Sequence, residues 1–254
     1  MAGILLSGCN GKMGKAVTAN VAVTSDAEII GGIDIFAESL YGYPVYGSPA
    51  LIPDEITKKA DVIIDFSNPS ALGGLLEYAV KNGIPAVICT TGLNDSQKTL
   101  IKSASEKIPV FFSANMSLGV NLVVELAKKA TAILGNDFDI EIVEMHHNQK
   151  IDAPSGTALM IADAIKEELD GETKYEYDRH SKREKRTKNE IGIHAVRGGT
   201  ITGEHEIIFA GHDEIIKISH SARSKELFAT GAVNAAKFIC GKSAGMYDMS
   251  EMLK

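Results

Sequence analysis

The sequence predicts an α/β protein with two domains, a doubly wound parallel sheet followed by an α+β domain with a mixed sheet. Two patterns along the 254 residues predict this fold. Before about Asn115, short apolar runs of strand length alternate with amphipathic stretches of helix length, which is typical of parallel strands joined by helices. After that point, three strand candidates follow one another without a helix, which indicates antiparallel or mixed pairing.

The first domain is expected to begin with a strand and then to alternate. The expected strands are residues 4–7, 28–34, 61–66, 86–90 and 110–113, and the expected helices are residues 13–24, 70–82 and 95–106. The run Asp-Val-Ile-Ile-Asp-Phe at 61–66 is almost continuously apolar, as in a strand buried on both faces. Gly83 and Pro85 are expected to end the second helix.

The second domain is expected to begin with a long helix at 117–134, whose apolar residues recur near helical spacing. These residues are Leu118, Leu122, Leu126 and Ile133. The later elements are a strand at 139–145, a helix at 155–169, strands at 192–196, 204–209 and 215–220, and a last helix at 225–239. The periodicity of that last helix does not indicate where in the fold it packs. The basic run at 179–188 is interpreted as a solvated loop rather than a binding site.

Composition and charge narrow the classes of function. Hydrophobic residues make up 44% of the chain and charged residues 23%, as in ordinary soluble proteins, and no apolar run would cross a membrane. The net charge of −7 argues against nucleic acid as the main partner. The N-terminus lacks a signal-peptide pattern, and Cys9, Cys89 and Cys240 form no close pair. Together these features predict a cytoplasmic protein without disulfides or structural zinc.

A glycine-rich turn joins the first strand to the first helix. The sequence there is Gly8-Cys9-Asn10-Gly11-Lys12-Met13-Gly14, with the spacing G-x-x-G-x-x-G. Glycines allow close approach to a pyrophosphate, and the following helix start offers N–H groups to the anion. The turn therefore indicates a Rossmann-like, dinucleotide-binding domain, although a glycine turn without a ligand is the alternative.

Asp34 ends the second strand, 20 residues beyond Gly14. A carboxylate at this place can accept hydrogen bonds from the hydroxyls of an adenine ribose, and it would repel a 2′-phosphate. The next residue is Ile35, which offers no compensating charge, whereas Lys12 in the loop compensates in part. The sequence therefore predicts NADH as the preferred cofactor, with NADPH possible. Asp is also a common turn former, which is the alternative interpretation.

Small and polar residues follow two later strands of the same domain. They are Thr90-Thr91-Gly92 and Ser113-Ala114-Asn115. Ligands of open parallel sheets bind outside the carboxyl ends of the strands, so these residues are candidates for the nicotinamide side of the site. The same residue types also occur in any loop.

Residues 144–158 combine several cations with a helix start. His146, His147 and Lys150 are three potential cations within five residues. Such crowding suits a proton donor working near neutral pH and a pocket that attracts a dicarboxylate. Gly156 and Thr157 could clamp a carboxylate with their N–H groups and the Thr157 hydroxyl.

This segment has two alternative interpretations: helix capping, which stays open, and a metal site, which is set aside. Ser155 or Asp152 could simply cap the helix after a surface loop. A metal site is not expected, because no metal-binding spacing accompanies the pair of histidines. The other histidines are scattered: His180, His194, His205, His212 and His220.

The segment 144–158 resembles the signature E-x-H-H-x-x-K-x-D-A-P-S-G-T-A of the dihydrodipicolinate reductase family at every fixed position. The loop at 8–14 and the segments 89–92 and 113–116 also resemble that family. The resemblance implies NAD(P)H-dependent reduction of dihydrodipicolinate, formed from 4-hydroxy-tetrahydrodipicolinate, to tetrahydrodipicolinate in lysine and diaminopimelate biosynthesis. It also implies a homotetramer assembled through the sheet of the second domain.

Carried over by position, the resemblance implies that His146 and Lys150 are the acid/base pair and that His147, Gly156 and Thr157 hold the substrate carboxylates. The implied cofactor-binding residues are Gly8, Cys9, Asn10, Gly11, Lys12, Met13, Asp34, Cys89, Thr90, Thr91, Ser113, Ala114, Asn115 and Met116. Residues 1–116 and 226–254 would form the dinucleotide-binding domain, and residues 117–225 the substrate-binding and oligomerisation domain. Two positions depart from the family. Cys89 stands where the family often has glycine. Ile35 stands where members that accept NADPH have a basic residue.

Two other functions share part of this pattern. Another two-domain nicotinamide enzyme, such as an aspartate or homoserine dehydrogenase, would share the glycine loop but would not need the His-His-x-x-Lys and Ser-Gly-Thr arrangement. A non-catalytic nucleotide-sensing module would need the loop but neither Lys150 nor the two histidines.

Overall fold

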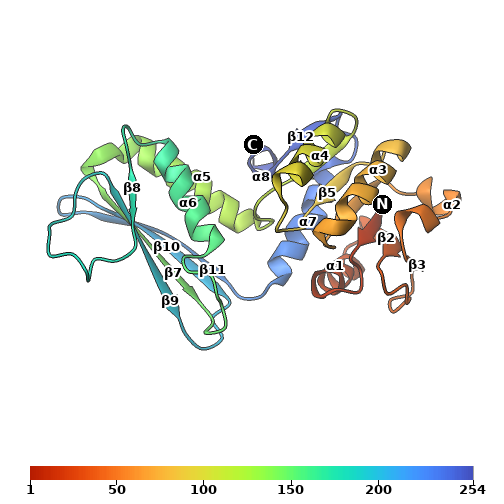
Figure 1. Ribbon diagram of the computed structural model, residues 1–254, viewed down its shortest axis with the longest axis horizontal. Coiled ribbons are helices and arrows are strands. Elements are labelled where there is room, and N and C mark those ends of the chain that lie inside the picture. The colour runs from red at the N-terminus through yellow and green to blue at the C-terminus, as the bar shows by residue number, and fades with distance from the viewer. Residues whose placement is uncertain (254) are drawn as a thin grey trace. The chain divides into compact units, whose positions relative to one another are not determined.

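The structure is a computed structural model, and it describes residues 1–253. The chain divides into two compact units. Unit 1 comprises Met1–Ser117 and the part from Lys225 onward, and unit 2 comprises Leu118–Ser224. Each unit is built on its own sheet (Figure 1). The predicted fold class is confirmed: one sheet is parallel and Rossmann-like, and the other is mixed.

The sheet of unit 1 has seven strands, all paired in parallel. In chain order the strands are β1 (Ala2–Ser7), β2 (Ala27–Ile33), β3 (Val45–Tyr46), β4 (Val62–Asp65), β5 (Ala86–Ile88), β6 (Pro109–Phe112) and β12 (Gly245–Tyr247). Their spatial order is β3-β2-β1-β4-β5-β6-β12. The chain therefore reverses its direction of winding between β1 and β4, and the carboxyl ends of all strands share one edge.

Helices cover both faces of this sheet (Figure 1). They are α1 (Lys12–Ala22), α3 (Leu72–Asn82), α4 (Asp95–Ser105) and α7 (Glu226–Ile239), with short helices α2 (Asp54–Thr57) and α8 (Met249–Met252). Side chains of β1 alternate between the faces: Ile4 and Leu6 pack with α1 and α7, whereas Leu5 packs with α3. Because both faces are covered, the strands need the continuously apolar runs seen in the sequence.

Local sequence explains where α3 ends and where α4 begins. The chain leaves α3 at Gly83, whose φ of 66° is left-handed and favours glycine. α4 begins with a capping box, in which the Asn94 side chain accepts from Gln97 N and the Gln97 side chain accepts from Asn94 N.

Unit 2 has a five-stranded sheet with the order β11-β10-β7-β9-β8. Its elements are α5 (Leu118–Leu134), β7 (Asp139–His146), α6 (Gly156–Glu167), β8 (Lys174–Glu176), β9 (Glu190–Arg197), β10 (Gly203–Ala210) and β11 (Ile215–Ala222). β10 pairs antiparallel with β7 and β11, whereas β9 pairs parallel with β7 and β8. Buried residues alternate along β7 and β10, because one face of the sheet packs on α5 and α6.

The structure differs from the sequence prediction at short elements and on α5. The strands β3, β8 and β12 were not predicted, because runs of two or three residues carry no readable periodicity. The predicted apolar residues of α5 do not form its buried face: Leu118, Leu122 and Leu126 are 40%, 48% and 44% exposed. The buried residues of α5 are Val120, Val123, Ala127 and Thr131.

The basic run at 179–188 is not simply a solvated loop, and that prediction was wrong for Arg186. Its guanidinium donates to Asp139 Oδ1 at 2.7 Å and to Glu141 Oε1 at 3.0 Å, and its side chain is only 16% exposed. Ion pairs also join Arg179 to Glu190 and Lys182 to Glu176. These acidic partners belong to the strands, so the loop is bound to the sheet by charge.

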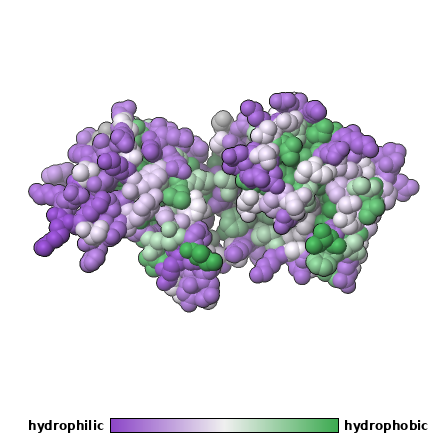
Figure 2. All heavy atoms as spheres, viewed as in Figure 1, coloured by the Kyte–Doolittle hydropathy of each residue, from purple (hydrophilic) through white to green (hydrophobic). Residues whose placement is uncertain are grey.

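The surface is mostly hydrophilic on the face shown in Figure 2, where hydrophobic residues form separate small areas. Among the residues described, no helix is long and apolar enough to span a bilayer.

Candidate functional site

In unit 1, the glycine-rich turn follows β1 at the point where the winding reverses. Gly8 has a φ of 75°, and a Cβ there would lie 2.5 Å from Phe66 O. A Cβ on Gly14 would lie 2.2 Å from Gly8 O. Both positions therefore require glycine, the first for its conformation and both for close backbone packing.

Helix α1 starts inside this turn, with Gly11 as its N-cap and no side-chain cap among the described residues. The first N–H groups of a helix have no partner within the helix, and the helix dipole favours an anion there. Gly11 and Lys12 are exposed and Met13 is half-buried. The start of α1 is thus suited to hold a phosphate group.

Asp34 lies beside this turn, directly after β2. Its Oδ2 accepts from Asn10 N at 3.0 Å, and its Oδ1 accepts from Phe36 N at 3.1 Å. The Asn10 amide donates to Phe36 O at 2.7 Å and to Glu38 O at 3.1 Å. The structure therefore brings the predicted residues of the loop and Asp34 together, while Ile35 points into solvent with an exposed fraction of 85%.

Cys9 lies in the turn, but its side chain belongs to the core. The thiol is buried, and a Cβ on Gly32 would lie 2.5 Å from Cys9 Sγ. Burial, together with the nearby Asp34 carboxylate, raises the pKa of Cys9 to about 11. Only the backbone of Cys9 is therefore free to face a ligand.

The predicted segments after β5 and β6 lie at the same edge of the sheet, with mixed exposure. Cys89 is buried, and burial followed by the charge of Asp65 raises its pKa well above the usual value. Thr90 is buried, whereas Thr91 and Ala114 are exposed and Ser113 and Asn115 are half-buried. Met116 is 4% exposed and packs in the core of unit 1, so its side chain is not available to a ligand.

Sequence reasoning missed Asp65, a fully buried carboxylate at the end of β4. Its Oδ1 accepts from Ser67 N at 3.1 Å and from Ser67 Oγ at 2.5 Å, and its Oδ2 accepts from Thr90 Oγ1 at 2.7 Å. Asp65 thereby holds the chain segments after β4 and β5. The signal in the sequence was an acidic residue inside an otherwise apolar strand.

In unit 2, the predicted catalytic residues lie at the end of β7. His146 is the last residue of β7 and is 8% exposed, and its Nδ1 lies 2.6 Å from Glu144 Oε2. A turn follows, in which Lys150 N donates to His147 O at 3.1 Å. Lys150 Nζ donates to Asp152 Oδ1 at 2.8 Å. The two predicted acid/base residues are thus each paired with a carboxylate.

The start of α6 has a side-chain N-cap, and the surroundings of Gly156 are uncrowded. Ser155 is the N-cap, and its Oγ accepts from Ala158 N at 3.2 Å. Apart from its chain neighbours and the nearby backbone of α6, no described atom lies within 4 Å of the place where a Cβ on Gly156 would stand. Ser155 therefore caps the helix, as the alternative interpretation proposed. The carboxylate-binding role of Gly156 and Thr157 stays a prediction.

Sequence reasoning assigned no role to Glu144, although it lies in the segment 144–158, and it missed Arg197 and His205 as members of this cluster. Arg197, at the end of β9, donates to Glu144 Oε1 and Oε2 at 2.7 and 2.8 Å. His205, on β10, has its Nε2 3.0 Å from Ser155 Oγ. Only strand pairing brings β9 and β10 next to β7, so no local pattern in the sequence identifies these partners.

His205 should make the protein less stable in mild acid. Burial, and next the charge of His146, lowers the pKa of His205 from 6.5 to about 4. Below about pH 6.5 the unfolded chain therefore binds a proton that the folded chain excludes, so stability present above that pH is lost as pH falls towards 4. We expect a loss of about 2 kcal/mol between pH 7 and about pH 5 from this group.

Urea unfolding at several pH values measures this effect. A His205→Gln variant should lose that part of the pH dependence while it keeps the contributions of the other titrating groups. An equal slope of stability against pH in both proteins would contradict the assignment.

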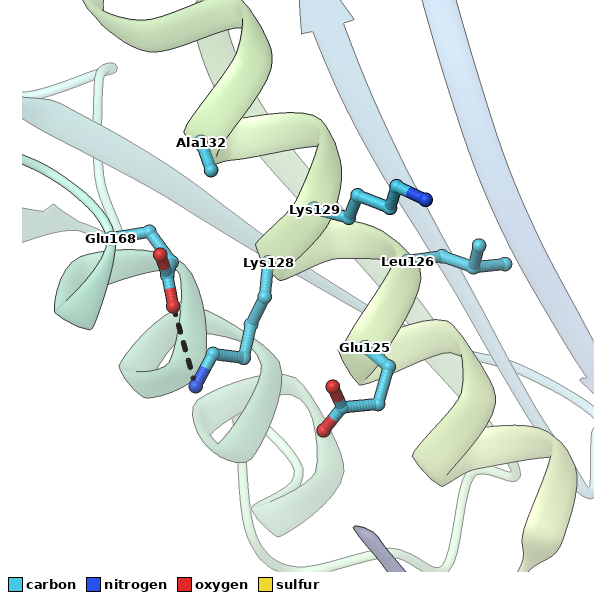
Figure 3. A pocket seen from close by; sticks show the side chains of 6 residues that line it. All are labelled: Glu125, Leu126, Lys128, Lys129, Ala132 and Glu168. Atoms are coloured by element: carbon cyan, nitrogen blue, oxygen red, sulfur yellow. Dashed lines mark ion pairs between the residues drawn. The ribbon is translucent and has the colours of Figure 1, made fainter. Parts of the chain in front are cut away.

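Neither metal-binding side chains nor a surface hollow of unit 2 indicates another functional centre. Among the described residues, no group of three or more His, Cys, Asp or Glu side chains could hold a metal ion. A shallow hollow of about 360 Å³ lies on the outside of α5 and α6 and is lined by Glu125, Leu126, Lys128, Lys129, Ala132 and Glu168 (Figure 3). Lys128 pairs there with Glu167 and Glu168, and the hollow contains none of the predicted site residues.

A parallel sheet of this strand order, with a glycine turn at the reversal and an acidic residue after β2, is the Rossmann-like arrangement of nicotinamide-dependent enzymes. Two family models match the chain: "Dihydrodipicolinate reductase, N-terminus" over residues 2–116 and "Dihydrodipicolinate reductase, C-terminus" over residues 119–253. The chain belongs to the dihydrodipicolinate reductase family. It is an NAD(P)H-dependent oxidoreductase of lysine and diaminopimelate biosynthesis.

Individual relatives agree over the full length. A protein from Caldanaerobacter subterraneus, described as 4-hydroxy-tetrahydrodipicolinate reductase, is 50% identical over 99% of this chain and 98% of its own length. A protein of the same description from Clostridium novyi is 46% identical over 100% of this chain and 99% of its own. The solved structure of a dipicolinate-bound dihydrodipicolinate reductase from Paenisporosarcina has a TM-score of 0.83 and 25% identity, with complete coverage of both chains.

Proposed function

We propose that the chain reduces dihydrodipicolinate, formed from 4-hydroxy-tetrahydrodipicolinate, to tetrahydrodipicolinate and prefers NADH as the hydride donor. The observation that carries this proposal is that β7 ends in His146 and a turn with His147 and Lys150 beside the start of α6, since Glu144 contacts both His146 Nδ1 and Ser155 N. The solved relative from Paenisporosarcina is bound to dipicolinate, a planar ring with two carboxylates. A dicarboxylate of that kind needs several donors and positive charges close together, which this part of unit 2 offers.

The residues of unit 1 fit a nicotinamide dinucleotide. The start of α1, with Gly8, Gly11 and the exposed Lys12, would hold the pyrophosphate. Asp34 would accept hydrogen bonds from the adenine ribose, and the segments 89–91 and 113–116 would lie on the nicotinamide side. When bound, the reduced nicotinamide supplies the hydride.

The residues of unit 2 would bind and orient the substrate. His147, Gly156 and Thr157 would hold the carboxylates. Lys150 Nζ is paired with Asp152, whose side chain is 57% exposed, so a substrate carboxylate can compete with that exposed partner. Asp152 would then hold Lys150 in place only while no substrate is bound.

Hydride addition to the conjugated ring leaves negative charge on its far side. His146 or Lys150 would donate the proton that neutralises this charge. His146 is suited to the role because Glu144 binds its Nδ1 and leaves Nε2 for the substrate. Cations near the ring would also stabilise the developing charge.

A direct assay tests the proposal and its cofactor preference together. We expect oxidation of NADH when freshly prepared dihydrodipicolinate is added, and an apparent affinity for NADPH that is lower by about tenfold or more, because the Asp34 carboxylate repels a 2′-phosphate. Ile35→Arg should raise the affinity for NADPH, since Ile35 is exposed next to Asp34. Ile35→Gln, which adds no charge, is the matched control. A clear preference of the unaltered protein for NADPH would refute the interpretation of Asp34 and Ile35.

The expectations on assembly and location also stay proposals. A homotetramer formed through the sheet of unit 2 is supported by apolar side chains on its strands, since Ile215 and Val196 are 64% and 43% exposed. The cytoplasm is proposed from the cysteine pattern and the biosynthetic role of the family. No observation favours a dehydrogenase acting on another amino acid or oxo acid.

A further inference from the structure

Glu144 is a fully buried carboxylate beside His146, the proposed proton donor. Four donors surround it. Its Oε1 accepts from Arg197 Nη2 at 2.7 Å and from Ser155 N at 3.0 Å. Its Oε2 accepts from Arg197 Nη1 at 2.8 Å and lies 2.6 Å from His146 Nδ1. Every direction in which this carboxylate can accept a hydrogen bond is therefore occupied.

These contacts keep Glu144 ionised. Burial alone would raise the pKa of Glu144, but the hydrogen bonds from Arg197, His146 and Ser155 outweigh burial and hold it below its usual value. Arg197 provides the compensating charge through a bidentate pair, with its own side chain 19% exposed. A buried carboxylate paired in this way is strongly oriented, because each oxygen is fixed by two donors.

An ionised Glu144 determines which nitrogen of His146 carries a hydrogen. A carboxylate can only accept, so His146 Nδ1 must be the donor in the 2.6 Å contact. The other ring nitrogen, Nε2, then takes up the proton that makes the ring a cation and donates that proton to the substrate. A Cβ on Gly203 would lie 3.0 Å from Nε2, so the glycine at the start of β10 leaves room at this edge of the ring.

The same carboxylate is joined to the start of α6. Ser155 N donates to Glu144 Oε1, and Ser155 immediately precedes Gly156 and Thr157. Arg197 Nη2 also donates to Asp152 O at 2.7 Å, in the loop that carries Lys150. One buried carboxylate and its arginine thus contact the ring of His146, the Lys150 loop and the helix start.

We propose that Glu144, held ionised by Arg197, is a positioning residue that keeps His146 protonated on Nδ1 with Nε2 directed to the substrate, and that aligns this ring with the start of α6. The inference rests on the proposed role of His146 as proton donor. It assigns Glu144 and Arg197 a part in turnover rather than in stability alone.

Other charged or titratable groups near this ring do not replace Glu144. The rings of His146 and His205 meet edge to face with their centroids 5.3 Å apart, and burial keeps His205 largely neutral near pH 7. Lys150 is bound to Asp152, and burial lowers the pKa of His220 on β11. Among the described residues, Glu144 alone makes a hydrogen bond to His146 Nδ1.

The test uses Glu144→Gln, which keeps the size of the side chain and removes its charge. An amide has one acceptor oxygen and one NH₂ donor, so it cannot accept from all four donors. If NH₂ faces Nδ1, it donates to that nitrogen and moves the ring hydrogen to Nε2. We expect kcat to fall by about 100-fold or more, because His146 donates from Nε2 only as a cation with hydrogen on both nitrogens, and the amide no longer stabilises that cation, while KM stays within a few-fold.

Nitrogen-15 spectra of labelled histidine read the tautomer directly. In the unaltered protein, the His146 signals should show hydrogen on Nδ1, and in Glu144→Gln they should show it on Nε2. A neutral His146 with hydrogen on Nε2 in the unaltered protein would overturn the proposal without any variant.

Glu141→Gln is the matched control. Glu141 lies on the same strand and also binds one arginine and one histidine, since it accepts from Arg186 Nε at 3.0 Å and pairs with His194 Nε2 at 2.8 Å. It contacts none of the proposed catalytic residues. Glu141→Gln should therefore keep kcat within about twofold even where it lowers the melting temperature.

Further variants distinguish a failure of the inference on Glu144 from a failure of the proposed proton donor. Arg197→Lys should retain more kcat than Arg197→Met, because lysine keeps the charge although it loses the bidentate geometry. This comparison decides the question if Glu144→Gln does not fold. An impaired His146→Gln together with a normal Glu144→Gln would overturn the inference alone. A normal His146→Gln would leave Lys150 as the donor, and it would overturn the inference, which rests on His146.

Discussion

Replacement of both proposed proton donors, His146→Gln with Lys150→Ala, should lower kcat by about 10²- to 10⁴-fold, the usual contribution of a positioned acid. Both residues belong to one short segment of unit 2: His146 is the last residue of β7, and Lys150 lies in the turn that follows. Without them, the charge left on the ring by hydride transfer can be neutralised only by water. The double change also removes the possibility that one donor substitutes for the other.

Single-turnover measurements with saturating NADH isolate this effect from cofactor binding. The Kd of NADH should be unchanged, because the substituted residues belong to unit 2 and the cofactor is proposed to bind unit 1. His212→Gln with Lys185→Ala is the matched control, since both residues are exposed. Near-normal turnover by the His146 and Lys150 double variant, with NADH still bound, would show that the acid assignment is wrong.

Gly14→Ala is expected to weaken NADH binding by about ten- to a hundredfold. The new Cβ would lie 2.2 Å from Gly8 O and 2.5 Å from Cys9 O, and both are backbone atoms that cannot rotate away. Overpacking of this kind costs about 1–3 kcal/mol, which corresponds to the expected change in Kd if the loop moves to relieve it. The loop would then no longer present the start of α1 correctly to the pyrophosphate.

Fluorescence titration with NADH gives the Kd, and circular dichroism confirms that the variant is folded. Gly74→Ala in α3 is the matched control, because no described atom beyond its chain neighbours and the nearby backbone of α3 lies within 4 Å of its Cβ position. It should leave the Kd unchanged and stabilise the protein by about 1 kcal/mol, as alanine does relative to glycine in helices. A folded Gly14→Ala variant with unchanged NADH affinity would contradict the proposed phosphate site.

Elements with a strong local pattern were predictable from the chain alone. The apolar run at 61–66 gave β4, and the glycine turn at 8–14 lies where the prediction put it, between the first strand and α1. Gly83 ends α3 as expected. In each case, a few neighbouring residues restrict the backbone strongly enough that distant contacts cannot change the result.

Prediction was weaker where a pattern supports more than one outcome. The leucines of α5 have helical spacing, but the helix turns another face, with Val123 and Ala127, towards the sheet. Arg186 stands in a strongly basic run and is nonetheless bound to two carboxylates of β7. Periodicity and charge describe one segment, whereas burial depends on what packs against it.

By itself, the sequence determined the parallel and mixed sheets, the glycine turn with its acidic neighbour, and the clustering of His146, His147 and Lys150 within five residues. Only the tertiary structure decided which groups surround His146. Arg197 reaches Glu144 from 53 positions away and His205 reaches Ser155 from 50, because β9 and β10 pair with β7 on either side. Strand pairing depends on contacts between residues far apart in the chain, so no local pattern can encode those neighbours.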